Sequence, residues 1–281
     1  MSTWSHTLLR AGTFKLDAGC MFGLIPKVVW TRWLTPDESN RMTMQQNALL
    51  LESSDGRLVV VEAGIGDKTA DKERGLYQQE PRAVHDALAE INCDPKDVSA
   101  VVLTHLHFDH AGGITRLDPA GGPKEVLTFP NAEIIVHRQE WEDAIANKST
   151  MSKTYLRSHL NDQVAERLRL VDGKDEPLPG LFVDPSPGHT WGQQNIRFAR
   201  PNNAGDGVFV SDVMPTHLHC RSTTNLAYDV EPYTSMLSRR ELLERAVKKH
   251  WLLVLDHEPG HPTFTAERDP NRPGEFLLQQ A

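Results

Sequence analysis

The sequence has few cysteines, no long apolar run and no excess of positive charge. Its three cysteines, Cys20, Cys93 and Cys220, are too few and too scattered for a disulfide framework or a thiolate zinc knuckle. No apolar stretch approaches the ~20 residues that span a bilayer. The net charge of −8 argues against a nucleic-acid or membrane partner, because phosphate binding requires a basic face. No signal-peptide pattern is visible, and we expect a soluble, cytoplasmic protein.

The length favours one domain over residues 1–281, because two-sheet and α/β folds often run to about 250 residues as one unit. Hydrophobic residues make up 39% of the chain, which is enough for a packed core. No repeat or clear linker separates a second domain. We expect residues 1–40 to contribute a loop that lines a pocket, and residues 269–281 to form an irregular tail.

Short strands dominate the predicted secondary structure. Residues 47–52 and 57–62 are β-rich runs joined by Ser-Ser-Asp-Gly, a sequence typical of a hairpin turn. Residues 98–104 are a short continuous apolar run, which indicates a strand covered on both faces. Further strands are predicted at 6–15, 133–137, 181–184, 194–200, 208–210 and 251–255, and helices at 81–91, 138–147, 154–170 and 234–250.

Four possible metal ligands lie within six residues, directly after the predicted strand 98–104. His105 and His107 are two residues apart, so they leave the same face of an extended segment. If the loop then turns, the side chains of Asp109 and His110 point toward a second position close by. An isolated histidine is usually a surface residue without a role. Four ligand-type side chains at this spacing favour a site that can hold two metal ions.

This cluster supplies too few ligands for two metal ions, and the rest of the chain offers three further candidates. His189, Asp212 and His257 each lie in a loop just after a short predicted strand. Each residue alone can be a turn or capping residue. Their shared place after successive strands supports a common metal site.

These residues make the sequence resemble the metallo-β-lactamase superfamily. His-Leu-His-Phe-Asp-His matches that family's HxHxDH signature, and the three later candidates match its later motifs in order. The resemblance covers about residues 40–260 and implies an α/β fold, an αββα sandwich of two mixed β-sheets flanked by helices. It further implies that His105, His107 and His189 bind one metal, that Asp109, His110 and His257 bind another, and that Asp212 bridges the two.

The implied ligands are imidazole nitrogens and carboxylate oxygens without a thiolate. Such a set suits two Zn²⁺ ions, and Mn²⁺, Fe²⁺ or Co²⁺ are also compatible. The sequence departs from the family in one place, because Val61-Glu62-Ala63-Gly64 stands where the superfamily usually has V-D-x-G. Glu62 has one more methylene than aspartate, and we expect it to orient a ligand histidine from behind.

A metal pair of this kind implies hydrolysis by attack of a metal-bridging hydroxide, because each cation lowers the pKa of bound water. Asp109, besides binding a metal, is expected to accept the proton of the nucleophile and pass it to the leaving oxygen. Tyr228 is a candidate donor to the developing oxyanion, with a packing role as the alternative. Asp109 and Tyr228 are therefore the predicted catalytic residues.

Further segments resemble YtnP-type quorum-quenching lactonases and N-acyl homoserine lactonases. The segment Met21–Trp30 matches the MFGxxPKxxW pattern of the first group, and residues 212–216 and 227–229 match other segments. The resemblance implies that the small-molecule substrate is a lactone, such as an acyl-homoserine lactone, and it suggests a homodimer. The apolar residues of the first segment either line an acyl pocket or pack the hairpin.

Two alternative functions stay open. One is hydrolysis of a phosphotriester or a carboxylic ester at the same metals. The other belongs to a different class, a non-hydrolytic metal-binding or iron redox protein. A true β-lactamase is disfavoured, because that group generally lacks the bridging aspartate that Asp212 would supply.

Other polar residues have weaker cases. His217 and His219 are interpreted as surface residues rather than as groups of the pocket. Asp256 is a candidate to orient a ligand, and Glu140 is expected to support the fold. No role is predicted for His6, His85, His159, His250 and His261.

Overall fold

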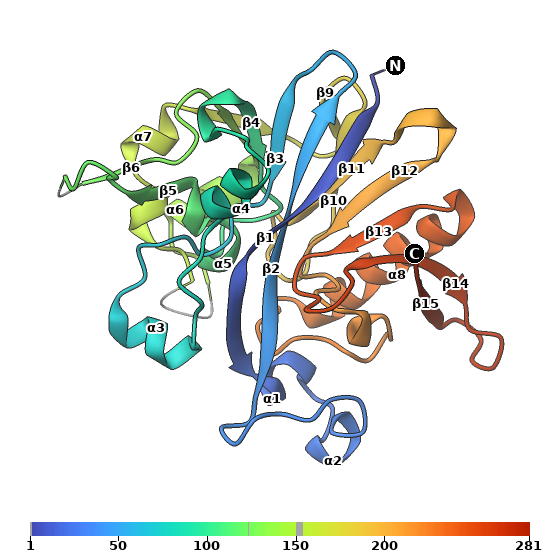
Figure 1. Cartoon of the computed structure of the whole chain (residues 1–281). Helices are drawn as coiled ribbons and strands as arrows, with labels where there is room; N and C mark the ends of the chain where they lie inside the picture. Colours follow the sequence, from blue (N-terminus) through green and yellow to red (C-terminus); the bar gives the residue numbers. More distant parts are fainter. Residues whose placement is uncertain (1, 123, 150–153) are drawn as a thin grey trace.

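The computed structural model describes residues 2–122, 124–149 and 154–281. Two β-sheets, of six and seven strands, pack face to face, and helices cover the outer faces (Figure 1). The arrangement confirms the predicted αββα sandwich. Within the described residues, no helix has the length and apolar character needed to cross a bilayer.

The first sheet has the strand order β1-β2-β3-β4-β7-β8. Its strands are β1 (Trp4–Asp17), β2 (Arg41–Ser53), β3 (Leu58–Val61), β4 (Val98–Val102), β7 (Glu133–His137) and β8 (Leu168–Val171). The predicted hairpin is confirmed, since β2 and β3 are antiparallel neighbours. From β3 onward the strands of this sheet run parallel, so their carboxyl ends meet at one edge.

The second sheet has the order β15-β14-β13-β12-β11-β10-β9. Its strands are β9 (Asp175–Leu178), β10 (Leu181–Pro185), β11 (Gln194–Ala199), β12 (Asp206–Val210), β13 (Leu252–Leu255), β14 (Thr263–Arg268) and β15 (Phe276–Gln280). Only β12 and β13 of these strands pair in parallel. A separate hairpin joins β5 (Thr115–Leu117) and β6 (Glu125–Leu127).

The helices of the described residues are mostly short. They are α1 (Ala18–Phe22), α2 (Lys27–Trp30), α3 (Asp71–Tyr77), α4 (Val84–Glu90), α5 (Phe108–Ala111), α6 (Arg138–Ile145), α7 (Asp162–Ala165) and α8 (Pro232–Lys249). The 3-10 turns are η1 (Pro95–Asp97), η2 (Gly112–Ile114), η3 (Arg157–His159), η4 (Pro201–Asn203) and η5 (His217–His219). Helices α4, α6 and α8 confirm three of the predicted helices.

The central strands bury side chains on both faces, as their apolar runs predict. In β4, Ala100 and Val102 lie in the core between the sheets, whereas Val101 packs on the side of α4 and α6. In β12, Phe209 lies between the sheets, whereas Val208 packs toward α8. This alternation explains why a continuous apolar run marks a strand here.

The long helix predicted over residues 154–170 is wrong. In the described part of this segment, the chain forms η3, then α7, and then enters β8. The side chain of Asn161 accepts a hydrogen bond from the Val164 backbone nitrogen at 3.2 Å, which begins a new helix at residue 162. The following residues extend because β8 pairs with β7 along the sheet.

The irregular tail predicted for residues 269–281 is also wrong at its end. Strand β15 pairs with β14 over five residues, from Phe276 opposite Arg268 to Gln280 opposite Phe264. Phe276 is buried in the cluster that packs on α8. The segment is extended because it pairs with β14, and its local sequence does not specify this pairing.

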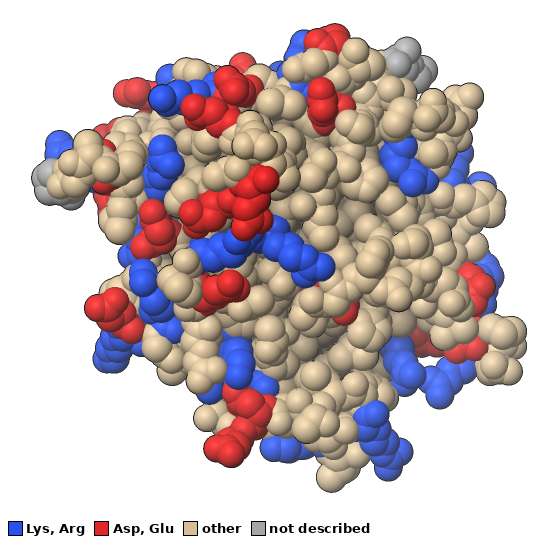
Figure 2. Space-filling model, viewed as in Figure 1, with Lys and Arg blue, Asp and Glu red and all other residues tan. Residues whose placement is uncertain are grey.

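Acidic and basic side chains are mixed over the face shown in Figure 2. Lysine and arginine lie beside aspartate and glutamate at several places, and uncharged residues occupy most of the hollowed centre of the view. The charge on this face is therefore dispersed rather than gathered into one patch of one sign.

Candidate metal centre

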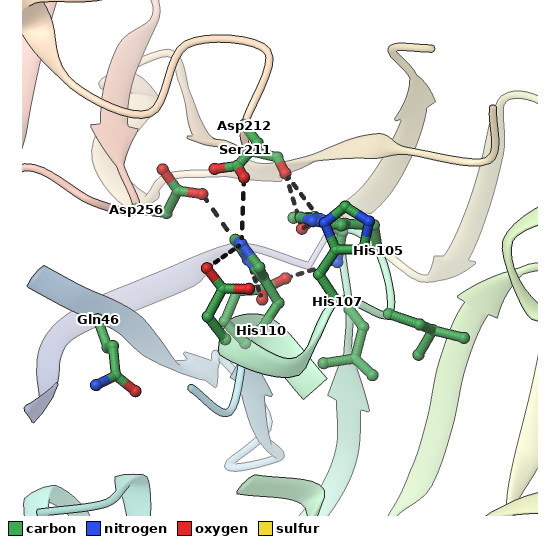
Figure 3. Close-up of polar contacts among 12 residues, drawn as sticks. Gln46, His105, His107, His110, Ser211, Asp212 and Asp256 are labelled. Carbon is green, nitrogen blue, oxygen red and sulfur yellow. Dashed lines mark hydrogen bonds and ion pairs between the residues drawn. The ribbon is translucent and has the colours of Figure 1, made fainter. Parts of the chain in front are cut away.

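The seven side chains predicted as metal ligands converge at one edge of the sandwich. His105, His107, Asp109 and His110 follow β4, and His189, Asp212 and His257 follow β10, β12 and β13. All seven are buried. Figure 3 shows His105, His107 and His110 facing Asp212 across the gap between the two sheets. The ends of strands far apart in sequence thus build one polar cluster.

Asp212 lies at the centre of this cluster. Its Oδ2 is 3.1 Å from His189 Nε2 and 3.6 Å from His110 Nε2, and its Oδ1 is 3.2 Å from His257 Nε2. Two sets of ligand atoms suited to a metal ion share this carboxylate, and the atoms of each set lie within 4.8 Å of one another. The first set is His105, His107, His189 and Asp212, and the second is His110, Asp212, Asp256 and His257.

Asp109 and Asp256 lie on different sides of the second set. The Oδ2 atom of Asp109 is 3.7 Å from His257 Nε2 and 3.9 Å from His110 Nε2. The Oδ2 atom of Asp256 is 3.9 Å from the same His257 nitrogen, and its Oδ1 accepts the His257 backbone N–H at 2.9 Å. Asp109 borders a cavity and Asp256 does not, so Asp109 is the carboxylate of this pair that faces substrate space.

The histidines of the second set turn lone pairs toward each other. His110 donates through Nδ1 to Glu62 Oε2 at 3.0 Å, and His257 donates through Nδ1 to the carbonyl oxygen of Gln45 at 2.9 Å. In the neutral rings each Nε2 is therefore an acceptor without a proton. These two Nε2 atoms lie only 3.2 Å apart. Two facing lone pairs repel unless a proton or a metal ion lies between them, and this geometry fits either one.

The first set also presents ring nitrogens that can bind an ion. His189 donates through Nδ1 to Asp229 Oδ1 at 3.0 Å, which leaves its Nε2 as an acceptor 3.0 Å from His107 Nδ1. His105 Nε2 is buried and has no hydrogen-bond partner among the described residues. A buried nitrogen of this kind is normally satisfied, so an ion that accepts its lone pair fits the donor set.

The pKa shifts divide the histidines of the cluster into two groups. Burial is the largest effect on His105 and His107, and it lowers the pKa of both rings well below the usual histidine value. Burial also raises the pKa of Asp212, but the neighbouring His189 and His257 outweigh this effect and hold it well below its usual range. Burial opposes protonation of His110, His189 and His257 as well, but neighbouring carboxylates outweigh it and raise the pKa of these rings, that of His257 to about 9. Metal binding at this cluster would therefore displace protons from these rings.

Glu62 occupies the place where the sequence departs from the family pattern. Its Oε2 accepts from His110 Nδ1, and its Oε1 accepts the backbone N–H of Thr104 at 2.6 Å. The backbone of Glu62 is left-handed, with φ 68°, a conformation that is uncommon for residues other than glycine. The longer side chain thus reaches His110 from a twisted backbone position and holds both ends of the His105–His110 segment.

Gly112 and Gly113 follow the cluster, and close backbone approach explains both. They lie in η2, where a Cβ on Gly112 would be 2.2 Å from the Ile65 carbonyl oxygen. A Cβ on Gly113 would be 2.1 Å from the Ala63 carbonyl oxygen. The chain therefore turns tightly after the cluster, and only glycine allows this close approach to the loop after β3.

The two histidines interpreted as surface residues differ in burial. His219 stacks on Phe22 with ring centroids 5.3 Å apart, and its Nε2 donates to the Met21 carbonyl oxygen at 2.8 Å. The surface interpretation of His219 is therefore wrong, whereas His217 is half-exposed and pairs with Glu258 at 2.7 Å. Long-range packing decides this difference, and the local sequence carries no signal for it.

His159 and Glu140 support the metal-binding segment from behind. His159 is buried, and its Nε2 donates to the Leu106 carbonyl oxygen at 3.1 Å. The sequence predicts no role for His159, and this prediction is wrong. Glu140 accepts the Leu106 backbone N–H at 2.9 Å and the Thr190 hydroxyl at 2.6 Å. Together they hold the residue between His105 and His107 in place.

A cavity of about 250 Å³ opens beside the cluster. The cavity wall nearest the cluster is polar and contains His107, Asp109, His189, Asp212 and His257. The remaining wall is mainly apolar and contains Leu16, Met21, Met44, Tyr77, Phe108, Thr154, Leu226 and Tyr228. Burial raises the pKa of the Tyr228 phenol, so its hydroxyl keeps its proton. The cavity therefore joins an apolar wall to the polar cluster.

Residues 41–257 match the family described as the Metallo-beta-lactamase superfamily. The chain belongs to this superfamily. It is 27% identical over 222 residues to the N-acyl homoserine lactonase AiiA of Bacillus thuringiensis subsp. kurstaki, a match that covers 74% of this chain and 79% of AiiA. It is 30% identical over 195 residues to the N-acyl homoserine lactonase AttM of Agrobacterium fabrum, covering 67% and 66% of the two chains.

Solved structures show the same architecture. A probable metal-dependent hydrolase from Staphylococcus aureus aligns with a TM-score of 0.84 and 27% identity, covering 99% of this chain and 98% of that one. The dizinc quorum-quenching lactonase AidC aligns with a TM-score of 0.78 and 17% identity, covering 99% and 94%. With the family match, these findings confirm the prediction of a metal-dependent hydrolase on this fold.

Proposed function

We propose that this protein is a dinuclear metal-dependent lactonase that opens the ring of N-acyl homoserine lactones. The observation that carries the proposal is the pair of buried ligand sets that share Asp212, next to a cavity with an apolar wall. The lactonase names of AiiA and AttM support the substrate class.

The proposed ligands are those expected from the sequence. His105, His107 and His189 would hold one ion, Asp109, His110 and His257 the other, and Asp212 both. Nitrogen and oxygen donors without thiolate suit Zn²⁺, and Mn²⁺, Fe²⁺ and Co²⁺ are compatible with the same donors. The dizinc state of AidC supports zinc. Two bound cations would lower the pKa of a shared water and polarise the lactone carbonyl.

Asp109 and Tyr228 are the proposed catalytic residues. Water adds to the lactone carbonyl, the ring C–O bond breaks, and the products are one carboxylate and one hydroxyl. Asp109 borders the cavity, and we assign to it the transfer of a proton from the attacking water to the leaving alkoxide oxygen. Tyr228 keeps its phenolic proton, and this hydroxyl would donate to the carbonyl oxygen as negative charge develops there.

The apolar wall would receive the acyl chain. Leu16, Met21, Met44 and Leu226 line the cavity opposite the polar cluster, and two of them come from the N-terminal segment 1–40. This placement supports the view that residues 1–281 act as one domain with that segment in the pocket. A homodimer and a cytoplasmic location stay predictions from the sequence.

The first experiment is metal analysis of protein purified without added metal. We expect two zinc ions per chain, and a chain that binds redox-active iron without hydrolytic activity would favour the alternative class. Ring opening of N-hexanoyl homoserine lactone releases one proton per turnover and is measured in a pH-stat. Phosphotriester and simple ester substrates are run beside it, and faster turnover of either would contradict the lactone assignment.

The second experiment tests Tyr228 with a matched tyrosine. Tyr228→Phe removes the hydroxyl and should lower kcat by about 100-fold, the lower end of the range for loss of an oxyanion donor. Tyr233→Phe changes an exposed tyrosine on α8 and should leave kcat within two-fold. An unchanged kcat in Tyr228→Phe would leave Tyr228 with the packing role alone.

A further inference from the structure

Helix α8 carries a buried arginine on its inward face. Arg239 is 2% exposed and lies on the same face as Leu242, Leu243 and Ala246. A buried cation is costly unless hydrogen bonds satisfy its donors. The position is unexpected for a helix face that otherwise packs apolar side chains against the second sheet.

Neutral oxygens accept hydrogen bonds from both Nη atoms of the guanidinium, whereas its buried Nε has no partner among the described residues. Its Nη1 donates to the carbonyl oxygens of Val213 at 3.0 Å and Thr224 at 3.3 Å. Its Nη2 donates to the Ser222 carbonyl oxygen at 3.0 Å and to Asn225 Oδ1 at 2.8 Å. All four acceptors belong to one stretch of chain, so Arg239 closes that stretch onto the helix at both of its ends.

This stretch belongs to a loop that we call the pocket loop, residues 213–229. The pocket loop begins directly after Asp212 and ends at Asp229. Leu226 and Tyr228 of the loop line the cavity. The loop therefore connects a proposed bridging ligand to a proposed catalytic residue.

The pocket loop also holds the N-terminal wall of the cavity. The backbone N–H of Ala227 donates to the Cys20 carbonyl oxygen at 2.8 Å, and His219 donates to the Met21 carbonyl oxygen. A Cβ on Gly23 would be 2.4 Å from the Asn225 carbonyl oxygen, so the two segments touch. A displacement of the pocket loop would move this wall with it.

At its far end the pocket loop holds a proposed metal ligand. Asp229 Oδ1 accepts from His189 Nδ1, and its Oδ2 accepts the Leu226 backbone N–H at 3.2 Å. Burial lowers the pKa of Arg239 to about 10, and the carboxylate of Asp229 counteracts the decrease. Arg239 is therefore a cation near neutral pH.

We infer that Arg239 is a positioning residue, which fixes the pocket loop so that Tyr228 meets the substrate and Asp229 holds His189. This inference rests on the proposed function. The competing explanation is that Arg239 only stabilises the packing of α8. That explanation predicts a lower melting temperature with no change in kcat and no coupling to Tyr228.

The variants are chosen to separate these explanations. Arg239→Met keeps much of the volume but leaves four oxygens without a donor, and we expect kcat/KM to fall about 10- to 100-fold, largely through kcat. Arg239→Lys keeps a cation with three donors and should recover at least three-fold of that loss. The control Arg240→Met changes the exposed neighbour, which pairs only with Glu244 among the described residues, and should stay within two-fold.

Combination with Tyr228→Phe tests the route of action. If Arg239 acts through the pocket loop, Tyr228→Phe should cost less than about two-fold in the Arg239→Met background, because the phenol is already misplaced. Multiplicative losses would overturn the inference, as would an Arg239→Met variant with wild-type kcat and only a lower melting temperature. If Arg239→Met does not fold, hydrogen exchange in Arg239→Lys decides the inference in place of this cycle.

Hydrogen exchange provides a readout that does not depend on the substrate. In Arg239→Met, or in Arg239→Lys if the first variant does not fold, amides of residues 213–229 should exchange at least ten-fold faster, with little change in β4. Equal acceleration in both regions, or none, would overturn the inference. If the wild-type protein opens no lactone, the proposed function fails, whereas the exchange result still decides the role of Arg239.

Discussion

The two sheets supply the candidate metal centre in different ways. The first sheet supplies four of the seven side chains from one short segment after β4, residues 105–110. The second supplies His189, Asp212 and His257 from three loops that only the strand order brings together. The ligands of one half of the site are therefore neighbours in the sequence, whereas those of the other half come together only when the second sheet forms.

The supports of the two halves differ in the same way. Glu62, at the end of β3, holds His110, and the two strands that carry them are parallel neighbours. Asp229 holds His189 from the end of the pocket loop, which depends in turn on α8. Adjacent strands support the ligands of the first half, whereas successive contacts through the pocket loop support His189 in the second half.

The largest effect is expected where the halves meet. Asp212→Ala removes the carboxylate that faces both sets of histidines and should lower kcat/KM by about 10³-fold or more, with fewer than two metals retained. Elemental analysis and lactone turnover measure this. Asp206→Ala, at the other end of β12, should keep both metals and stay within two-fold. Full metal content and turnover in Asp212→Ala would contradict the assignment.

The next effect compares the two supporting carboxylates. Each of these carboxylates accepts two N–H groups, one on each oxygen. Glu62→Gln and Asp229→Asn leave only one acceptor oxygen, so one N–H group loses its partner. We expect a loss of about 10- to 100-fold in metal affinity or kcat for both variants, the usual size for partners of ligand histidines. Competition with a chelator measures the affinity. A loss confined to one variant would show that only one half needs its support.

A stability measurement sharpens the comparison for the first half. Gly112→Ala places a methyl group against the Ile65 carbonyl oxygen and should lower the free energy of unfolding by about 1–3 kcal/mol. Gly75→Ala, in α3 with open space around it, should not lower it, because alanine favours helix. Urea unfolding measures both. Equal free energies of unfolding for the two variants would mean that the loop after β3 moves aside for the added methyl group at little cost.

The smallest effect lies outside both halves. The backbone N–H of Arg41, together with Lys15 and the Arg41 side chain, lowers the pKa of Asp37 to about 2. A lowered carboxyl pKa contributes stability above the unfolded value of about 3.9 and loses it as the pH falls toward 2. In urea unfolding, Asp37→Asn should therefore have a lower free energy of unfolding than wild type at pH 5, and the two values should converge near pH 2. A difference that stays constant with pH would contradict this.

The sequence predicts the first half of the site well because its information is local. An apolar run buried on both faces marks β4, and the four ligand-type residues follow it directly. The second half is predictable only as candidates, since each residue follows a recognisable strand. The family resemblance, rather than the spacing, groups His189, Asp212 and His257 with the first cluster.

The features that sequence analysis misses all depend on distant partners. His159, His219 and Arg239 are polar residues whose burial is decided by segments far away in the chain. Strand β15 needs β14 beside it, and residues 154–170 lose the predicted helix because β8 pairs with β7. Local patterns describe a strand that is apolar in itself, and they fail where a neighbour determines the conformation.

The left-handed backbone at Glu62 has a consequence for anyone who selects this enzyme for heat tolerance. Glycine adopts that conformation without penalty, but at this position it would leave the buried Thr104 N–H and the His110 ring without their acceptor. A library screened for folding alone would therefore be expected to keep glutamate here, against the preference of the backbone.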